Sequence, residues 1–198
     1  MYIIGITGGS GCGKTTALEL LRECGALILD CDQIYHGLLK TDRALLSDIE
    51  AAFPGTVKDG VLDRKTLGAL VFGNKTALKQ LNALTHPAVV REVKRQLQEK
   101  KPELAGIDAI GLLDSGLKEL CDVTVAVIAP RKARLLRIMA RDGLDEAAAA
   151  APIDAQPSNR SFAARCDFTL KNNGSPTLFR KRCEALLDAL LRTASSNE

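Results

Sequence analysis

The order of apolar and polar positions along the chain predicts short buried strands that alternate with amphipathic helices. Predominantly apolar runs, which are typical of strands buried on both faces, occur at residues 2–6, 26–29, 107–113, 123–128 and 168–170. Helical spacing fills residues 33–101, where no convincing strand is present, and returns at 131–141 and 178–191. The pattern predicts an α/β fold: a parallel sheet with helices on both faces, and a helical insertion between the second and third strands.

Turn and cap patterns refine two parts of this prediction. The sequence Thr-His-Pro at residues 85–87 predicts a helix start, because proline is favoured in the first helical turn. Residues 145–151 predict a short alanine-rich helix that Pro152 ends. Residues 152–161 hold two prolines together with Ser, Asn and Gln, which indicates a mobile loop after the basic helix.

Composition is that of an ordinary single-domain protein. The 198 residues are enough to bury a core without disulfides, and none of the six cysteines forms a C-x-x-C pair. No run approaches the ~18 apolar residues of a membrane span, and the N-terminus is a core strand rather than a signal peptide. A net charge of +3 and the absence of Trp do not favour nucleic acid. We expect a cytoplasmic protein with reduced thiols and no membrane or nucleic-acid partner.

A glycine-rich motif follows the first predicted strand. Residues 8–15 read Gly-Gly-Ser-Gly-Cys-Gly-Lys-Thr, which fits the phosphate-binding pattern G-x-x-x-x-G-K-[ST]. The glycines let successive backbone N–H groups turn toward a polyphosphate at the start of a helix. Lys14 is then expected to reach the β- and γ-phosphates, and the Thr15 hydroxyl to ligate Mg²⁺. A chance match has odds of roughly 1%, so the motif predicts a protein that binds a nucleoside triphosphate.

Two carboxylates end the second predicted strand, Asp30 and Asp32. Ligands of open α/β sheets bind outside the carboxyl ends of the strands, so both side chains are expected near the phosphate-binding loop. A carboxylate there can accept the proton of an attacking alcohol or hold the water shell of Mg²⁺. The structural alternative is that one of them caps the next helix. We favour the functional interpretation, more strongly for Asp32 than for Asp30.

The basic segment at residues 131–141 places three arginines on one helical face. Arg134, Arg137 and Arg141 are spaced i, i+3 and i+7, and the opposite side carries apolar residues for the core: Leu135, Leu136 and Met139. Such a row suits a clamp on phosphates, and the mobile loop beyond it suits a lid that closes over ATP and excludes water. A solvated cationic face is the alternative, and it is as good an interpretation for Arg134.

In their order and spacing these segments resemble the dephospho-CoA kinase family, which performs the last step of coenzyme A biosynthesis. Residues 6–15 are similar to the family's "LTGGIGSGKS", residues 29–34 to "IDADxI", and residues 84–87 to its "HP" helix start. Residues 137–143 resemble "RxxxRDG", and Gln156 with residues 167–174 resembles "Q…AD…NxG". The likeness covers residues 2 to about 190.

The resemblance implies transfer of the ATP γ-phosphoryl group to the 3′-hydroxyl of dephospho-CoA. It implies that Asp32 accepts the hydroxyl proton and that Arg141 contacts the ATP phosphates from the lid. With Lys14 these residues form the expected catalytic set. The expected nucleotide site comprises Gly11, Cys12, Gly13, Lys14, Thr15, Thr16, Arg137, Arg141 and Asn172, with Thr15 also on the metal. The expected substrate site comprises Thr7, Asp30, Asp32 and His36.

The family's fold is a nucleoside-monophosphate-kinase-like P-loop core with a helical substrate domain and a lid. We therefore expect one kinase domain of 198 residues, active as a monomer or a small homo-oligomer. The expected core is residues 1–32, 102–140 and 166–198, the helical substrate-binding insertion is residues 33–101, and the lid is residues 141–165.

Three residues depart from the family's frequent pattern. Asp114 stands where the family often has glutamate, and Pro152 and Phe162 stand where arginine and lysine are frequent, which affects the lid. His86 is interpreted as structural rather than catalytic. The alternatives are another P-loop small-molecule kinase, such as a nucleoside or shikimate kinase, or an ATP-binding regulator without catalysis. The intact Lys14, Thr15 and Asp32 argue against the regulator.

Overall fold

The structure is a computed structural model that describes residues 1–195. The chain divides into two compact units, one formed by residues 1–29 with the chain from residue 102 onward and the other by residues 30–101. We call them the sheet unit and the helical unit. The end of the predicted core segment, residues 196–198, lies outside the described residues. The assignments of a substrate-binding insertion and a lid remain predictions.

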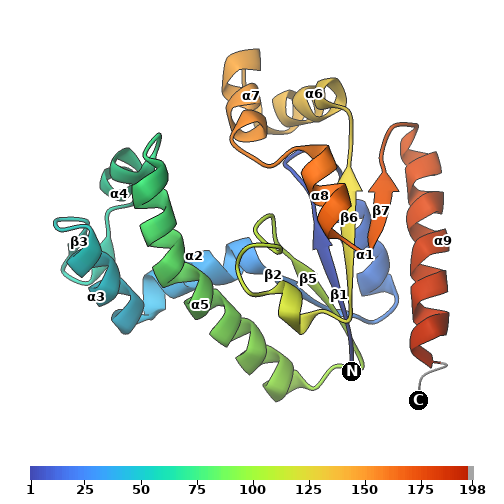
Figure 1. Ribbon diagram of the computed structural model, residues 1–198, viewed down its shortest axis with the longest axis horizontal. Helices are drawn as coiled ribbons and strands as arrows, with labels where there is room; N and C mark the ends of the chain where they lie inside the picture. The colour runs from blue at the N-terminus through green and yellow to red at the C-terminus, as the bar shows by residue number, and fades with distance from the viewer. Residues whose placement is uncertain (196–198) are drawn as a thin grey trace. The chain divides into compact units, whose positions relative to one another are not determined.

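The sheet unit is built on five strands in the order β2-β5-β1-β6-β7 (Figure 1). The strands are β1 (Tyr2–Thr7), β2 (Leu27–Asp30), β5 (Leu104–Asp108), β6 (Val123–Ile128) and β7 (Phe168–Lys171). Central β1 pairs in parallel with β5 and β6, with Ile6 opposite Asp108 and Thr7 opposite Ala126. Since β6 also pairs in parallel with β7, the carboxyl ends of these strands meet at one edge, which confirms the predicted α/β class.

The helices of the sheet unit each present an apolar face, three of them mainly to the strands and the two within residues 131–154 mainly to each other. They are α1 (Lys14–Glu23), α6 (Arg131–Asp142), α7 (Glu146–Asp154), α8 (Asn159–Arg165) and α9 (Pro176–Ser195), with a short 3₁₀ turn at Lys118–Leu120. The main core joins alternate strand residues such as Ile4, Ile6 and Val125 to Leu21 of α1 and Phe179 of α9. Helix α8 contacts β6 and crosses in front of it in Figure 1.

The helical unit has a second apolar core of its own. Its elements are α2 (Cys31–Thr41), α3 (Arg43–Ala52), β3 (Val57–Lys58), β4 (Val61–Leu62), α4 (Arg64–Val71) and α5 (Lys75–Lys100). The core packs Leu45 and Ile49 of α3 against Leu81 of α5. Asp42 and Asn74 begin α3 and α5, because their side-chain oxygens accept hydrogen bonds from backbone N–H groups of the first turn.

Two predictions for this unit are wrong. A two-stranded hairpin, β3–β4, interrupts the segment that was expected to lack strands, with Val57 opposite Leu62. Its turn is Asp59-Gly60, and both residues have positive φ, which is the geometry that an Asp-Gly pair favours. Pro87 does not start a helix but lies inside the 26-residue α5, where Ala88 and Val89 are buried beside it. The packed neighbours hold the helix through a residue that would end an isolated one.

The sheet unit corrects the predicted element bounds. Strand β5 ends at Asp108, so the run that was expected to continue to residue 113 turns away from the sheet. Helix α7 includes Pro152, and α8 begins at Asn159, so only residues 155–158 of the expected mobile loop lie between helices. The apolar face of α6 also differs: Ile138 is buried, whereas Leu136, which was assigned to the core, is 57% exposed.

The departures from the family pattern have structural explanations. Phe162 is 1% exposed on α8, so the sheet unit uses it as a core residue where lysine or arginine is frequent. Pro152 is accommodated within α7. Asp114 forms an exposed ion pair with Arg165, whose Nη2 lies 2.6 Å from Asp114 Oδ1. None of these three residues lies in the phosphate-binding loop.

Candidate active site

The glycine-rich segment forms a loop between β1 and α1, as its sequence predicts. Gly8, Gly11 and Gly13 all have positive φ, at 143°, 74° and 98°. A Cβ added at Gly8 would overlap the Val127 carbonyl, and one at Gly13 would overlap the Asn172 amide. The loop therefore requires glycine both for its backbone conformation and for the close approach of its neighbours.

Three consecutive loop carbonyls are held by side chains from distant parts of the chain. Arg134 Nε donates to Ser10 O at 2.8 Å, and Arg137 Nη1 donates to Gly11 O at 3.1 Å. Asn172 Nδ2 donates to the third carbonyl, that of residue 12, at 2.9 Å. The C=O and N–H of a trans peptide point in opposite directions, so anchoring these carbonyls turns the following N–H groups to the opposite side of the loop. That side is available for phosphate oxygens.

A glutamine between α7 and α8 binds the same loop. Gln156 Oε1 accepts a hydrogen bond from Ser10 N at 2.8 Å, and Gln156 Nε2 donates to Ser10 Oγ at 2.8 Å. Arg134 Nη2 also donates to Gln156 Oε1, at 3.0 Å, and Arg137 Nη2 donates to Asn172 Oδ1 at 3.1 Å. The loop, the basic helix and the segments after α7 and β7 thus form one hydrogen-bonded network.

The two arginines of this network contribute positive charge behind the loop. Arg134 is 4% exposed, and burial lowers the pKa of its guanidinium from the ordinary value. Within the described part of the chain neither Arg134 nor Arg137 forms a salt bridge. Their guanidinium groups donate to carbonyl and amide oxygens, which carry no full negative charge. The positive charge of the two arginines is therefore not neutralised, and it favours an anion bound to the loop.

Lys14 lies at the start of α1 with its ammonium beside the loop. Its Nζ donates to Gly8 O at 3.2 Å and lies 3.8 Å from Asp108 Oδ1. Both side chains are largely buried, at 14% and 22% exposed. Asp108 was missed in the sequence because the strand was expected to continue past it. One pattern could have found it. Asp108 is a carboxylate at the end of an apolar run, and that run pairs with β1, the strand that leads into the glycine motif.

The residues near Lys14 suit a magnesium ion that is bound mainly by phosphates and water. Thr15 is exposed in the first turn of α1, and Asp108 supplies a carboxylate at the end of β5. Magnesium in phosphoryl-transfer sites usually takes only one or two protein oxygens. Residues 1–195 contain no group of three or more His, Cys, Asp or Glu residues that could hold a metal ion by themselves. A hydroxyl and a carboxylate are the appropriate donor types.

Two further predicted contacts are buried. Thr7 is fully buried, and its Oγ1 donates to Ile110 O at 3.2 Å. Cys12 is 1% exposed, and burial raises the pKa of its thiol while the Lys14 charge opposes that rise. The Cys12 side chain therefore packs as a neutral group, and its backbone N–H donates to Gly9 O at 3.2 Å.

The predicted substrate residues occur at the start of α2. Asp30 is the N-cap of that helix: its Oδ1 accepts from Gln33 N at 3.0 Å, which is the structural alternative considered for it. Asp32 is exposed in the first turn, and among residues 1–195 its carboxylate accepts no hydrogen bond. The His36 ring packs against Tyr35, with centroids 5.5 Å apart.

The predicted row of arginines divides into two environments. Arg134 and Arg137 bind the loop, whereas the Arg141 side chain is 67% exposed and pairs with its neighbour Asp142 at 2.7 Å. That pairing raises the pKa of Arg141. The structure brings together Lys14, Arg137 and Asn172, and it does not bring Arg141 to the loop.

A parallel sheet whose central strand leads through a glycine loop into a helix, with a lysine at the helix start, defines a P-loop protein that binds a nucleoside triphosphate. The chain belongs to the dephospho-CoA kinase family, because the model of the family "Dephospho-CoA kinase" matches residues 2–177. It is 40% identical over 192 residues to the dephospho-CoA kinase of Anaeromyxobacter dehalogenans, covering 94% of this chain and 91% of that protein. It is 34% identical to that of Latilactobacillus sakei, covering 96% of each.

Solved structures agree with this assignment. A Thermus thermophilus protein described as TT1252 has a TM-score of 0.79 and 33% identity, with 97% of each chain covered. The dephospho-CoA kinase of Campylobacter jejuni has a TM-score of 0.67 and 28% identity over 97% of this chain and 98% of that one. A shikimate kinase from Acinetobacter baumannii, at 17% identity and a TM-score of 0.56, shares the fold. Across the described residues, no helix is long and apolar enough to cross a membrane.

Proposed function

We propose that this protein transfers the γ-phosphoryl group of ATP to the 3′-hydroxyl of dephospho-CoA and releases CoA and ADP. The observation that carries the proposal is the phosphate-binding loop, whose carbonyls are held by Arg134, Arg137 and Asn172. Membership of the dephospho-CoA kinase family supplies the acceptor. The bond between the 3′-oxygen and the γ-phosphorus forms as the bond from that phosphorus to the β–γ bridging oxygen breaks.

The loop binds the triphosphate through its backbone. The N–H groups of Gly11 and of residues 13–15 donate to the phosphate oxygens, and Lys14 neutralises charge on the β- and γ-phosphates. Arg137 and Asn172 act on the nucleotide by fixing the loop that binds it. Thr15 and Asp108 are the residues that would hold Mg²⁺, which neutralises phosphate charge when it is bound.

The acceptor side is assigned to the helical unit. Asp32 accepts the proton of the 3′-hydroxyl as the oxygen attacks, and its exposed carboxylate supports this role. Asp30 orients the start of α2, and His36 contributes to the substrate site. Thr7, which is buried at the end of β1 in the sheet unit, acts on the substrate only by holding the backbone at Ile110. Residues 33–101 act as the substrate-binding insertion and residues 141–165 as the lid, which brings Arg141 to the phosphates on closure.

A coupled assay of ADP release tests this proposal. Purified protein is given ATP and Mg²⁺ with dephospho-CoA, or with a panel of nucleosides, sugars and shikimate. We expect turnover with dephospho-CoA alone, and a product whose new phosphate is on the 3′-oxygen by phosphorus NMR. Preferred turnover of a nucleoside or shikimate would assign the chain to another P-loop kinase activity. Binding of ATP without turnover of any acceptor would indicate a regulator.

A further inference from the structure

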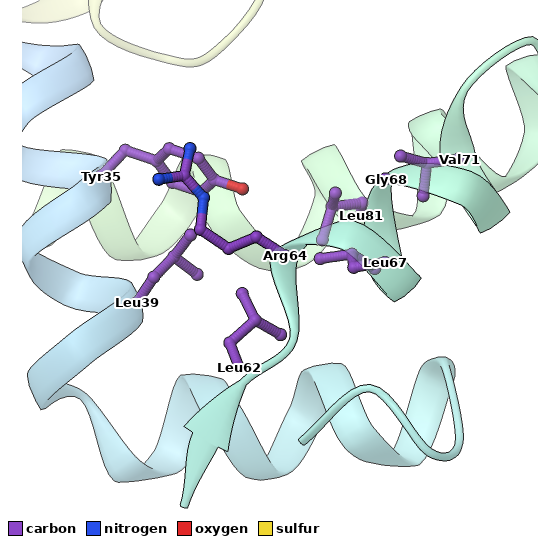
Figure 2. Close-up of a pocket in the computed structure, with 8 residues that line it drawn as sticks. All are labelled: Tyr35, Leu39, Leu62, Arg64, Leu67, Gly68, Val71 and Leu81. Carbon is purple, nitrogen blue, oxygen red and sulfur yellow. The ribbon is translucent and has the colours of Figure 1, made fainter. Parts of the chain in front are cut away.

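The helical unit contains a cavity of about 160 Å³ between α2, β4, α4 and α5 (Figure 2). Five aliphatic side chains form most of its wall, and Tyr35, Arg64 and Gly68 complete it. The cavity is open to solvent on one side, so a group of a ligand can enter it. It is smaller than pockets that enclose a whole drug-sized ligand and suits one group of a larger molecule.

Only two residues of the cavity wall carry polar side-chain atoms, Tyr35 and Arg64. In Figure 2 the Arg64 guanidinium lies beside the Tyr35 ring. Burial raises the pKa of Tyr35, and the charge of Arg64 opposes that rise, which places the guanidinium within electrostatic range of the phenol. Arg64 is exposed and forms no salt bridge within residues 1–195. The cavity thus has a mainly apolar wall and, at one side, the Arg64 guanidinium, which can bind an anionic group.

The cavity and the proposed proton acceptor share one helix. Asp32, Tyr35 and Leu39 are spaced i, i+3 and i+7 along α2, which puts them on one face. At the helical rise, Tyr35 lies about 4.5 Å along the axis from Asp32, and Leu39 lies about 10 Å from it. If the reacting hydroxyl of the substrate contacts Asp32, other groups of the same substrate molecule can therefore reach the cavity.

We propose that this cavity binds the pantoyl group of dephospho-CoA, with its two methyl groups among the leucines and the adjoining diphosphate paired with Arg64. This inference rests on the proposed function. The diphosphate and the pantoyl group are consecutive in the substrate, as the guanidinium and the aliphatic wall are adjacent in the cavity. Arginine is suited to diphosphate because its planar fork donates two parallel hydrogen bonds.

The adenine ring of the same substrate fits the cavity poorly. Its ring nitrogens and amino group would each lose a hydrogen bond to water, and only Tyr35 and Arg64 of the wall carry polar side-chain atoms that could replace one. The pantoyl methyl groups need no such partners and gain from leaving water. The chemistry of the wall therefore selects the arm of the substrate rather than its base, and it makes the arm a determinant of acceptor specificity.

Gly68 provides a direct test. It lines the cavity from α4, its φ is ordinary, and a Cβ built there meets no atom within 4 Å. Gly68→Leu fills the cavity and also improves helix propensity, so the variant should fold. We expect the KM for dephospho-CoA to rise about tenfold or more, with the KM for ATP and kcat unchanged within about twofold. Ala69→Leu, which adds bulk at the exposed neighbouring position, is the matched control and should behave like the parent.

A substrate fragment distinguishes the pantoyl group from other parts of the molecule. 4′-Phosphopantetheine, which carries the arm and one phosphate but no adenosine, should compete with dephospho-CoA in the parent protein. Gly68→Leu and Arg64→Gln should each weaken that competition several-fold. Dephospho-CoA without its thiol should bind as tightly as the complete substrate, because the cavity holds the other end of the arm. Since Arg64 is exposed, its variant decides the question if Gly68→Leu fails to fold.

The outcomes separate the two proposals. A parent protein that turns over dephospho-CoA, together with a Gly68→Leu variant of unchanged KM, overturns the cavity assignment and leaves the function intact. Competition by 4′-phosphopantetheine that neither variant weakens overturns it as well. A parent protein that neither binds nor phosphorylates dephospho-CoA overturns the function, and the cavity assignment with it. Equal losses in Gly68→Leu and Ala69→Leu would assign the effect to α4 rather than to the cavity.

Discussion

The two units of this protein hold their functional side chains by different means. In the sheet unit, the hydrogen bonds of Arg134, Arg137 and Gln156 to the phosphate loop join residues 124 to 146 positions apart. In the helical unit, the hydrogen bonds that cap and close its turns join residues no more than seven apart. Its long-range cohesion comes from an apolar core.

This difference matches what each side of the reaction requires. The loop must present N–H groups in fixed directions before the nucleotide arrives, because preorganised donors stabilise developing charge most effectively. Hydrogen bonds are directional, so a polar network is suited to that task. The helical unit, if it takes the acceptor as proposed, must enclose a long, partly apolar substrate, and an aliphatic wall gives contact area without a strict geometry. Variants on each side should therefore separate nucleotide effects from acceptor effects.

The largest effect is expected on the helical side, from Asp32→Asn. This change keeps the size of the side chain and removes the carboxylate that we propose as the proton acceptor. Turnover should fall by roughly 10² to 10⁴, while ATP affinity changes little. Steady-state kinetics and calorimetric titration with ATP measure the two quantities. Loss of ATP binding with turnover retained in the bound complex would make Asp32 a metal or folding residue.

On the sheet side, Lys14→Ala removes the cation that we propose to contact the β- and γ-phosphates. Charge stabilisation of this kind is commonly worth about 3 kcal/mol or more, so turnover should fall by about 10² to 10³. Glu19→Ala, on the exposed face of the same helix, is the control. The proposed role of Lys14 fails if its variant keeps more than half of the parent turnover.

Arg141→Ala tests whether the exposed end of α6 joins the site on closure. If it does, turnover should drop about 10- to 100-fold, since a cation that meets the phosphates in the closed state is lost. Lys132→Ala, an exposed cation outside the arginine row, should have almost no effect. Amide exchange across residues 141–165 should slow when ATP and dephospho-CoA are both bound. An active Arg141→Ala protein with unchanged exchange would assign Arg141 to the solvated surface.

Arg137→Ala should act on nucleotide binding more than on chemistry. The carbonyl of Gly11 and the Asn172 amide lose their donor, so the loop becomes less fixed. We expect the KM for ATP to rise about tenfold, with the KM for dephospho-CoA unchanged within twofold, because a hydrogen bond to a charged group contributes about 1.5–3 kcal/mol. A variant that loses kcat at saturating ATP and keeps its KM would instead place Arg137 on the transferred phosphoryl group.

The smallest effect concerns the local bonds of the helical unit. Asn74→Ala removes the side-chain acceptor from the N–H groups of Thr76 and Ala77 at the start of α5. The free energy of unfolding should fall by about 1 kcal/mol, and kcat should not change. Denaturant titration measures the first quantity. A loss of activity without a loss of stability would contradict the view that this cap is only structural.

Local chemistry made much of this fold readable from the sequence. The apolar run, the glycine motif and the helix after it predicted β1, the loop and α1 correctly, because their information lies within 23 residues. The β3–β4 hairpin was also readable from Asp59-Gly60, and the long helical pattern around it concealed that turn. Pro87 misled the prediction because tertiary packing, which a propensity does not contain, carries α5 through it.

The positions of the site residues were less predictable. The spacing of Arg134, Arg137 and Arg141 predicted that the three side chains share one helical face. Periodicity in the sequence does not predict which part of the protein that face contacts. Burial of Arg134 depends on Ser10 and Gln156, which are far from it in the sequence. Asp108 was missed because its strand ends earlier than the apolar run suggests. The roles assigned to Asp32, His36 and Arg141, like the predicted cytoplasmic location and oligomeric state, stay predictions.

The distant partners of the phosphate loop also set the order in which it can be completed during synthesis. The ribosome produces the whole motif within the first 15 residues, whereas the donors to its carbonyls are encoded between residues 134 and 172. Central strand β1 likewise waits for β5 and β6, the second of which ends at Ile128. A nascent chain that stops before residue 134 therefore carries the complete motif but lacks the partners that fix its shape.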